Sequence, residues 1–343
     1  MFRTETTLII GAGANREIEM PDGPELLNRI AAGFDFDRLG TEVQSRDLIA
    51  MAHLFEAIAP ELGTTHEELI KAGRAIRAAS FVTPSIEAIL EQQSDNPNVQ
   101  AAGKLAIVYY TLQAESKSTL ARAPRDEGEL PLRGTENWLF KLGQMMVSGV
   151  PRRDVQNCFY KLSIIAFTYD RSIEHYLPWV AAMAFDMPVE EAQALVALHL
   201  RIVHPLGIAG QLPWQGDDKP NIDWGTDNPE NILDLTRMIY TSSQRMKRRQ
   251  FAEYLLAEMA QGRRLAFLGF DFDPIKLRMI FDEEPMDTNP DVLAALSDVP
   301  EPQQPGVARL LKKKTGVPGD DYLKLFTSTP YAILRDNSLM LES

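Results

Sequence analysis

Two glycines stand one residue apart near the start of the chain, at Gly11 and Gly13, where an apolar run ends. Glycine lets the backbone turn sharply and approach a ligand closely, and a strand that breaks at Gly-x-Gly and leads towards a helix suits a pyrophosphate. The third glycine of the dinucleotide-binding motif is missing, because Arg16 stands in its place. On these residues alone, a purely structural turn is an equally good interpretation.

A threonine, an aspartate and a histidine follow two later apolar runs and could carry chemistry. His204 titrates near neutral pH and could accept a proton from a hydroxyl group or water, or it could simply bond to a loop. Asp170 could accept hydrogen bonds from a ribose or an amide, although an aspartate after a strand is also a common helix cap. Thr168 offers a hydroxyl group, although threonine is also common in strands. Asp271 is typical of a turn before the helix predicted near Pro274.

These residues can form one site only if a sheet brings the ends of distant segments together. Buried strands are predicted at residues 7–10, 162–167, 200–203 and 264–268, with helical patterns between them. Strands that alternate with helices indicate a Rossmann-like α/β fold, with a mainly parallel sheet covered on both faces. Each run ends in glycine, carboxylate, hydroxyl or imidazole groups, and ligands bind at the carboxyl edge of such sheets. We therefore expect one site along that edge.

The segment after the first strand is almost wholly helical, which predicts a large helical insertion at residues 35–160 within one domain of residues 1–343. Its strongest helical pattern covers residues 98–118, with a wide apolar stripe that places this helix deep in the structure. Lys104 and Glu115 interrupt the apolar character. They either lie on the polar face of the helix or reach into a cleft.

Three further segments are predicted to be irregular or are left open. A polar, proline-containing loop is expected at residues 123–134, and the only obvious flexible linker is at residues 300–305. The C-terminal extension, residues 285–343, has no predicted role.

The composition excludes several classes of function. The net charge of -13 argues against general binding of nucleic acid or anionic membranes, which needs a basic surface. The single cysteine, Cys158, excludes an intramolecular disulfide and a cysteine-based zinc site, and no other metal motif is present, so no metal is expected. No targeting or membrane-spanning pattern is found, which predicts a soluble, cytoplasmic protein. Motifs for phosphoryl transfer, zinc hydrolysis and serine hydrolysis are also missing.

Taken in order, these pieces resemble the sirtuin-like superfamily, in its bacterial branch of zinc-less, helix-rich proteins that includes NAD-hydrolysing anti-phage effectors. Residues 11–15, with Pro21 behind them, are similar to the Gly-Ala-Gly-Ala-Ser segment of the family and its trailing proline. Residues 167–174 resemble its Asn-Tyr-Asp segment, and residues 202–207 its histidine segment. Residues 268–270 look like its later Gly-Phe strand end. Two helical segments, at 85–87 and 103–107, also look like this branch.

The resemblance implies an NAD site and no metal. The pyrophosphate would lie over the first glycine segment, the nicotinamide and its ribose near the second and third strand ends, and the adenosine near the fourth. In this order, the implied residues are Gly11, Ala12, Gly13, Asn15 and Pro21; Thr168, Asp170 and His204; and Gly269, Phe270 and Asp271. In the family, an asparagine precedes the Tyr-Asp pair and positions the attacked ribose and its water, and the histidine serves as base. Thr168 occupies that asparagine position here, and Asn15 replaces the usual serine.

Three functions follow as hypotheses. The first is cleavage of the N-glycosidic bond of NAD to nicotinamide and ADP-ribose in anti-phage defence, and protein deacylation is less well supported because the zinc ribbon is missing. The second is a non-catalytic sensor of NAD or ADP-ribose, which the threonine at position 168 favours. The third is an assembly subunit whose sheet binds no nucleotide. A homo-oligomer is expected by analogy with the family.

Overall fold

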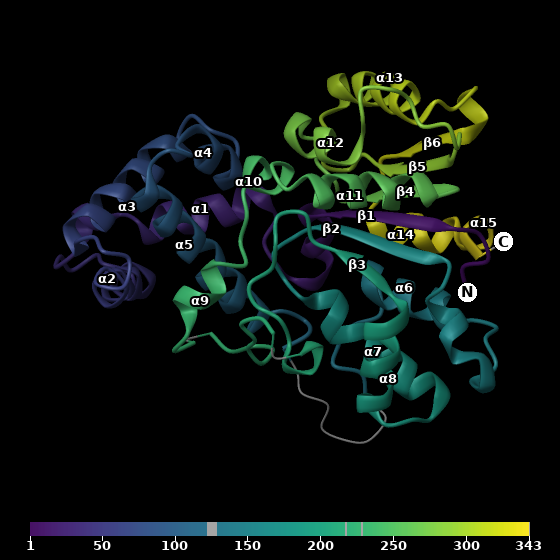
Figure 1. The fold of residues 1–343 in the computed structure, drawn as a ribbon, viewed down its shortest axis with the longest axis horizontal. Helices are drawn as coiled ribbons and strands as arrows, with labels where there is room; N and C mark the ends of the chain where they lie inside the picture. Colours follow the sequence, from purple (N-terminus) through teal and green to yellow (C-terminus); the bar gives the residue numbers. More distant parts are fainter. Residues whose placement is uncertain (122–128, 217, 228, 343) are drawn as a thin grey trace.

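A computed structural model describes residues 1–121, 129–216, 218–227 and 229–342. Within these residues, the chain forms one sheet of six parallel strands in the order β3-β2-β1-β4-β5-β6 (Figure 1). This is the Rossmann strand order, and it reverses between β1 and β4. The strands are β1 (Thr6–Gly11), β2 (Leu162–Phe167), β3 (Arg201–Val203), β4 (Arg264–Leu268), β5 (Asp291–Ala295) and β6 (Leu323–Phe326).

The central strand is buried on both faces because its apolar residues alternate between two cores. Ile9 of β1 is paired with Ile165 of β2 and Phe267 of β4, and all three belong to one buried cluster. Leu8 and Ile10, its neighbours in sequence, belong to a second cluster on the other face. A strand that contributes to two cores reads as a continuous apolar run, which is why β1 was recognisable from sequence.

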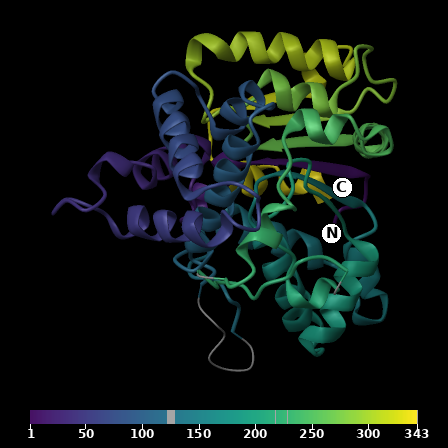
Figure 2. The same ribbon diagram turned by 60° about the vertical axis from the view of Figure 1, so that its left-hand side comes forward.

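The helices between β1 and β2 separate into two groups. The helices α1 to α5 gather beyond the carboxyl ends of the strands, at the left of Figure 1 and again in Figure 2, whereas α6 packs with α7 and α14 on one face of the sheet. This segment contains η1 (Ala12–Ile18), α1 (Gly23–Gly33), η2 (Phe36–Arg38), α2 (Arg46–Ile58), α3 (His66–Ser80), α4 (Ile86–Gln92), α5 (Pro97–Glu115), α6 (Trp138–Val147) and η3 (Arg152–Cys158). The predicted helical insertion after the first strand is therefore present.

The later helices cover both faces of the sheet. α11, α12 and α13 contribute to the same cluster as the first helical group, and α7, α8, α14 and α15 to the second cluster. Their bounds are α7 (Ser172–Phe185), α8 (Val189–His199), η4 (Pro213–Gln215), α9 (Ile232–Thr236), α10 (Ser242–Met246), α11 (Arg249–Gln261), α12 (Pro274–Ile280), η5 (Glu301–Gln303), α13 (Gln304–Thr315), η6 (Asp320–Tyr322), α14 (Pro330–Asp336) and α15 (Ser338–Glu342).

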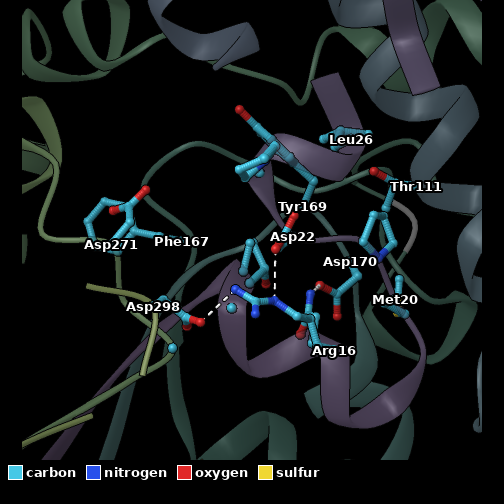
Figure 3. Close-up of a pocket in the computed structure, with 18 of the residues that line it drawn as sticks. Arg16, Met20, Asp22, Leu26, Thr111, Phe167, Tyr169, Asp170, Asp271 and Asp298 are labelled. Atoms are coloured by element: carbon cyan, nitrogen blue, oxygen red, sulfur yellow. Dashed lines mark hydrogen bonds and ion pairs between the residues drawn. The ribbon is translucent and has the colours of Figure 1, made fainter. Parts of the chain in front are cut away.

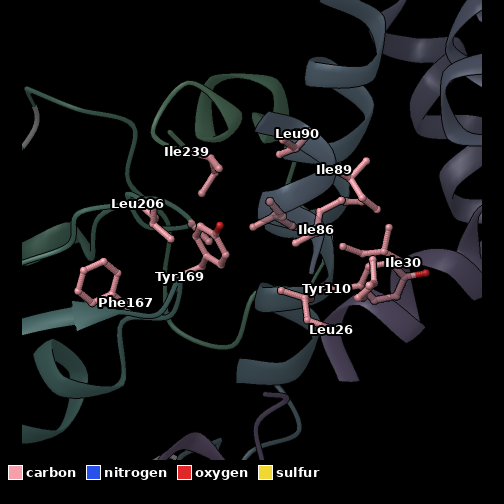
Figure 4. Packing of buried hydrophobic residues seen from close by; sticks show 14 of the residues in the cluster. Leu26, Ile30, Ile86, Ile89, Leu90, Tyr110, Phe167, Tyr169, Leu206 and Ile239 are labelled. Carbon is pink, nitrogen blue, oxygen red and sulfur yellow. The ribbon is translucent and has the colours of Figure 1, made fainter. Parts of the chain in front are cut away.

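The first helical group packs directly on the strand ends. Figure 4 shows Tyr169 and Leu206, which follow β2 and β3, facing Ile86 of α4 within one buried cluster. The hydroxyl group of Tyr169 also donates to Glu87 Oε1 at 2.9 Å. Helices of the insertion therefore cover the carboxyl edge of the sheet.

Two of the predictions for the C-terminal part were incomplete or wrong. Residues 285–343 add β5 and β6 to the sheet, which extends it to six strands. The predicted flexible linker at 300–305 is instead η5 followed by the first turn of α13. Pro302 and Pro305 stand in the first turns of these helices, where a missing N–H group costs nothing.

The strand and helix positions agree with the sequence patterns to within a few residues, and Thr65 and Glu68 form a capping box at the start of α3. Of the predicted loop at 123–134, residues 123–128 lie outside the described residues, and 129–134 form no helix or strand. No helix in the described ranges is both long enough and apolar enough to cross a membrane.

Candidate functional site

A cavity of about 140 Å³ lies at the carboxyl edge of the sheet, where the strand order reverses (Figure 3). The loops after β1, β2, β4 and β5 line it, and α1, α4, α5 and α12 complete its wall. Its lining includes Ala12, Gly13, Asn15, Arg16, Pro21, Asp22, Glu87, Thr168, Asp170, Gly269, Asp271, Lys276 and Asp298. Ligands of doubly wound sheets bind at this place, so it is the candidate site.

The loops after β1 and β4 interlock through their glycines. Gly13 N donates to Gly269 O at 3.0 Å. A Cβ atom at position 11 would overlap the carbonyl oxygen of Gly269, and Gly269 itself has a φ of 59° in the left-handed region. The glycines therefore permit close backbone contact between two strand ends, which is a structural role in addition to any ligand contact. The chain passes from Gly11 directly into the 3-10 helix η1, which contains Gly13, and α1 begins only after the cap at Asp22.

Replacing Gly11 with alanine should lower the free energy of unfolding by at least about 2 kcal/mol, because the new methyl group overlaps backbone that cannot move aside cheaply. Gly23→Ala is the matched control, since a Cβ atom there meets nothing within 4 Å, and it should stay within about 0.5 kcal/mol of wild type. Urea unfolding followed by circular dichroism measures both. Equal stability of the two variants would show that the loops can separate without cost.

Asp170 is buried between the glycine loop and the start of α7. Its Oδ2 accepts from Asn15 Nδ2 at 2.7 Å, and its Oδ1 accepts from Ser172 N at 3.0 Å. Only 3% of Asp170 is exposed, and within the described residues Asn15 Oδ1 is buried without a hydrogen-bond partner. The N-cap residue of α7 is Arg171, so Asp170 is not the cap predicted from sequence, but its carboxylate accepts from the first N–H group of the helix and also faces the cavity.

The segment that carries Asp170 is fixed by a buried ion pair. Arg171, the next residue, pairs with Glu115 of α5, and both side chains are fully buried. Arg171 Nη1 also donates to the backbone oxygen of Ile222 at 2.6 Å. Glu115 therefore holds a strand end, which is neither of the two positions predicted for it from sequence. His175 stacks on Trp224 at 4.4 Å beside this pair, and burial with the nearby Arg171 charge lowers the pKa of His175 to about 3.

His204 lies beside the cavity but is not among the residues that line it. Its Nδ1 lies 3.2 Å from Thr168 O, and its Nε2 lies 2.8 Å from Glu174 Oε1. Burial alone would lower the pKa of His204, but the Glu174 carboxylate outweighs burial and raises it. A protonated His204 can donate to both oxygens and thereby position Thr168. Action as a base would require the ring to leave Glu174.

This pKa shift predicts a pH-dependent stability. The pKa of His204 is higher in the folded protein than its usual 6.5. The contribution of its protonated ring to the free energy of unfolding is therefore fully present below pH 6.5, and it is lost as the pH rises through the pKa of the folded state. The free energy of unfolding of wild type should therefore fall relative to His204→Gln above about pH 6.5. Urea unfolding of both proteins, in steps from about pH 6 to pH 9, measures the difference. A constant difference across this range would contradict the prediction.

Eight of the predicted site residues line the cavity together, and three do not. Those that line it are Ala12, Gly13, Asn15, Pro21, Thr168, Asp170, Gly269 and Asp271. Besides His204, the exceptions are Gly11, which is packed against Gly269, and Phe270, which is fully buried. The Phe270 ring packs with Phe167 and Phe267, at centroid distances of 5.3 and 5.7 Å, so its side chain belongs to the core.

Several charged lining residues were not predicted from the sequence. Figure 3 shows Arg16 between two carboxylates: its Nε lies 2.8 Å from Asp22 Oδ2, and its Nη2 lies 2.6 Å from Asp298 Oδ1. Lys276 pairs with Asp271 at 2.6 Å. Burial alone would lower the pKa of Lys276, but the nearby carboxylates, Asp271 first, raise it. In the sequence, Arg16 stands where the motif would have its third glycine, and its charge beside a glycine loop is the signal that could have predicted it as a site residue.

The cavity has an acidic balance. In the described part of the chain, its lining holds five carboxylates and two cationic side chains; the carboxylates are Asp22, Glu87, Asp170, Asp271 and Asp298, and the cations are Arg16 and Lys276. Such a lining favours a ligand with a cationic portion. The cationic side chains that an anionic portion could meet in this lining are Arg16 and Lys276, and both are paired with carboxylates. The described residues contain no group of three or more His, Cys, Asp or Glu side chains that could hold a metal ion.

No protein-family model matches the chain, and no curated protein matches it.

Proposed function

We propose that the protein binds NAD along the carboxyl edge of the sheet and hydrolyses its nicotinamide N-glycosidic bond. The observation that carries this proposal is the buried Asp170 carboxylate, held by Asn15 in an acidic cavity at the point where the strand order reverses. The location suits a dinucleotide beside a glycine loop. The order of the motifs, which resembles that of the sirtuin-like superfamily, supports the same ligand and a role in anti-phage defence.

The charge of the cavity supports cleavage of this bond in particular. The nicotinamide of NAD is a cationic pyridinium, and positive charge develops on the ribose as the bond to C1′ breaks. The bonding electrons go to the ring nitrogen, so nicotinamide leaves as a neutral molecule and needs no acid. A carboxylate facing this ribose stabilises the oxocarbenium-like transition state, as carboxylates do in glycoside hydrolysis.

Water completes the reaction by forming the new bond to C1′ and losing a proton. The carboxylates of the lining can take up this proton, and at the start of the reaction the ribose needs no base. His204 enters this scheme as a positioning residue, since it contacts the backbone oxygen of Thr168. In this scheme the lining carboxylates stabilise the transition state by their charge, and no histidine with a free ring nitrogen is needed.

The test is to incubate the full chain with NAD, separate the products by chromatography, and titrate ADP-ribose by calorimetry. The proposal expects nicotinamide and ADP-ribose in equal amounts. Failure of both ligands to bind, at concentrations that would saturate a nucleotide-binding enzyme, would refute the NAD site.

A non-catalytic sensor of NAD or ADP-ribose is the second candidate. It is favoured by the engagement of both His204 ring nitrogens and by Thr168, which lacks the amide that the family has at this position. NAD binding without nicotinamide release would favour this candidate. Nicotinamide release gained by Thr168→Asn would then identify position 168 as the reason for inactivity.

A further inference from the structure

We propose that Asp298 makes the site selective for NAD over NADP, an inference that rests on the proposed NAD site. Asp298 comes from the C-terminal extension and is the lining residue that follows β5. The proposal gives the C-terminal extension, residues 285–343, a role in ligand choice, whereas the sequence predicted no role for it.

The position of Asp298 is defined by backbone and side-chain contacts. Leu296 N donates to Phe326 O at 2.7 Å, and Val299 N donates to Leu296 O at 3.0 Å, so the turn that carries Asp298 is tied to β6. The side chain of Asp298 is only 13% exposed. Arg16 contacts its Oδ1, while its Oδ2 lies against Gly13, where a Cβ atom would overlap it. The carboxylate therefore stands directly beside the glycine loop.

This position places Asp298 at the nucleoside on the β4 side of the cavity. Thr168 and Asp170 follow β2, on one side of β1, whereas Gly269 and Asp298 follow β4 and β5, on the other. With the reacting ribose at Asp170, a dinucleotide that crosses the glycine loop brings its adenosine ribose towards Asp298. A carboxylate there can accept hydrogen bonds from the 2′- and 3′-hydroxyl groups, and it repels a 2′-phosphate.

Arg16 sharpens the argument, because the group that would accept a 2′-phosphate is already present. Dinucleotide sites that take NADP use an arginine where NAD sites use an acidic residue. Here the Arg16 guanidinium is neutralised by Asp298 and Asp22. Removing the charge of Asp298 should free Arg16 for the phosphate while removing the repulsion, so one carboxylate determines the preference.

The experiment titrates the full chain by calorimetry with ADP-ribose and with ADP-ribose 2′-phosphate. The two ligands differ only in the 2′-phosphate on the adenosine ribose, as NAD and NADP do. Both lack the nicotinamide bond that would be cleaved, so turnover does not disturb the measurement. Wild type should bind ADP-ribose at least about tenfold more tightly, and Asp298→Asn should reduce this ratio at least about tenfold. Glu301→Gln is the matched control, because it removes a carboxylate from the same segment that is exposed and does not line the cavity, and it should keep the ratio within about threefold of wild type.

Three results would overturn the inference: equal binding of the two ligands by wild type, an unchanged ratio in Asp298→Asn, or the same loss of preference in Glu301→Gln. If neither ligand binds, the NAD site and the inference fail together. A preference for ADP-ribose without nicotinamide release would refute hydrolysis but leave the inference standing. Asp298→Ser, checked with Asp298→Asn by thermal unfolding, provides a second variant if the asparagine perturbs the turn.

Discussion

Asp170→Asn should slow nicotinamide release by about a hundredfold or more, while ADP-ribose binding changes by less than about threefold. The substitution removes a negative charge that faces the ribose in the proposed NAD complex, and this charge matters most when positive charge develops on that ribose. The geometry should survive. An asparagine oxygen can still accept from Ser172 N, and the Asn15 amide can turn over to present its oxygen to the new amide.

Initial rates of nicotinamide release at saturating NAD, measured by chromatography, test this prediction. Asp271→Asn is the matched control, because Asp271 lines the same cavity on the β4 side but is half exposed and paired with Lys276. Its rate should stay within about fivefold of wild type, since an exposed charge in water contributes little. A wild-type rate in Asp170→Asn, or equal losses in the two variants, would remove Asp170 from the mechanism.

Arg171→Met should destabilise the protein by about 3–5 kcal/mol, because it leaves the Glu115 carboxylate buried without its partner. The substitution also removes the donor to Ile222 O and so loosens the loop that covers this pair. Since Arg171 directly follows Asp170, the same change should disorder the cavity and abolish ligand binding before the rest of the sheet unfolds.

Urea unfolding measures this effect, with two variants to interpret it. Arg249→Met removes an ion pair to Glu253 that is largely exposed, and it should change the free energy of unfolding by less than about 1 kcal/mol. Arg171→Met combined with Glu115→Leu removes both charges and should recover a large part of the lost stability. A double variant as unstable as Arg171→Met alone would show that the backbone contacts of Arg171, and not the unpaired carboxylate, cause the loss.

The sequence by itself determined the elements that surround the site. The strands β1, β2 and β4 are apolar runs buried on both faces, and burial on both faces is visible in the sequence as consecutive apolar residues. Local capping signals were equally reliable, since Thr65 bonds its own helix start and Asp273 caps α12. Because all strands are parallel, their polar ends had to meet at one edge. That argument predicted the neighbourhood of Gly13, Asp170 and Gly269 correctly.

Only the tertiary structure decided which charges face the cavity and which are held elsewhere. Arg16 pairs with Asp298, which is 282 positions away in the chain, and His204, which follows β3, contacts Glu174 of α7. The sequence pattern does not place Asp298, because it predicts no strand at β5 and a flexible linker just after this residue. The periodicity of apolar residues indicates whether a side chain is buried, because burial depends on the face of its own helix or strand. It does not record the partner of a charge, because strand order and loop packing bring that partner from another part of the chain.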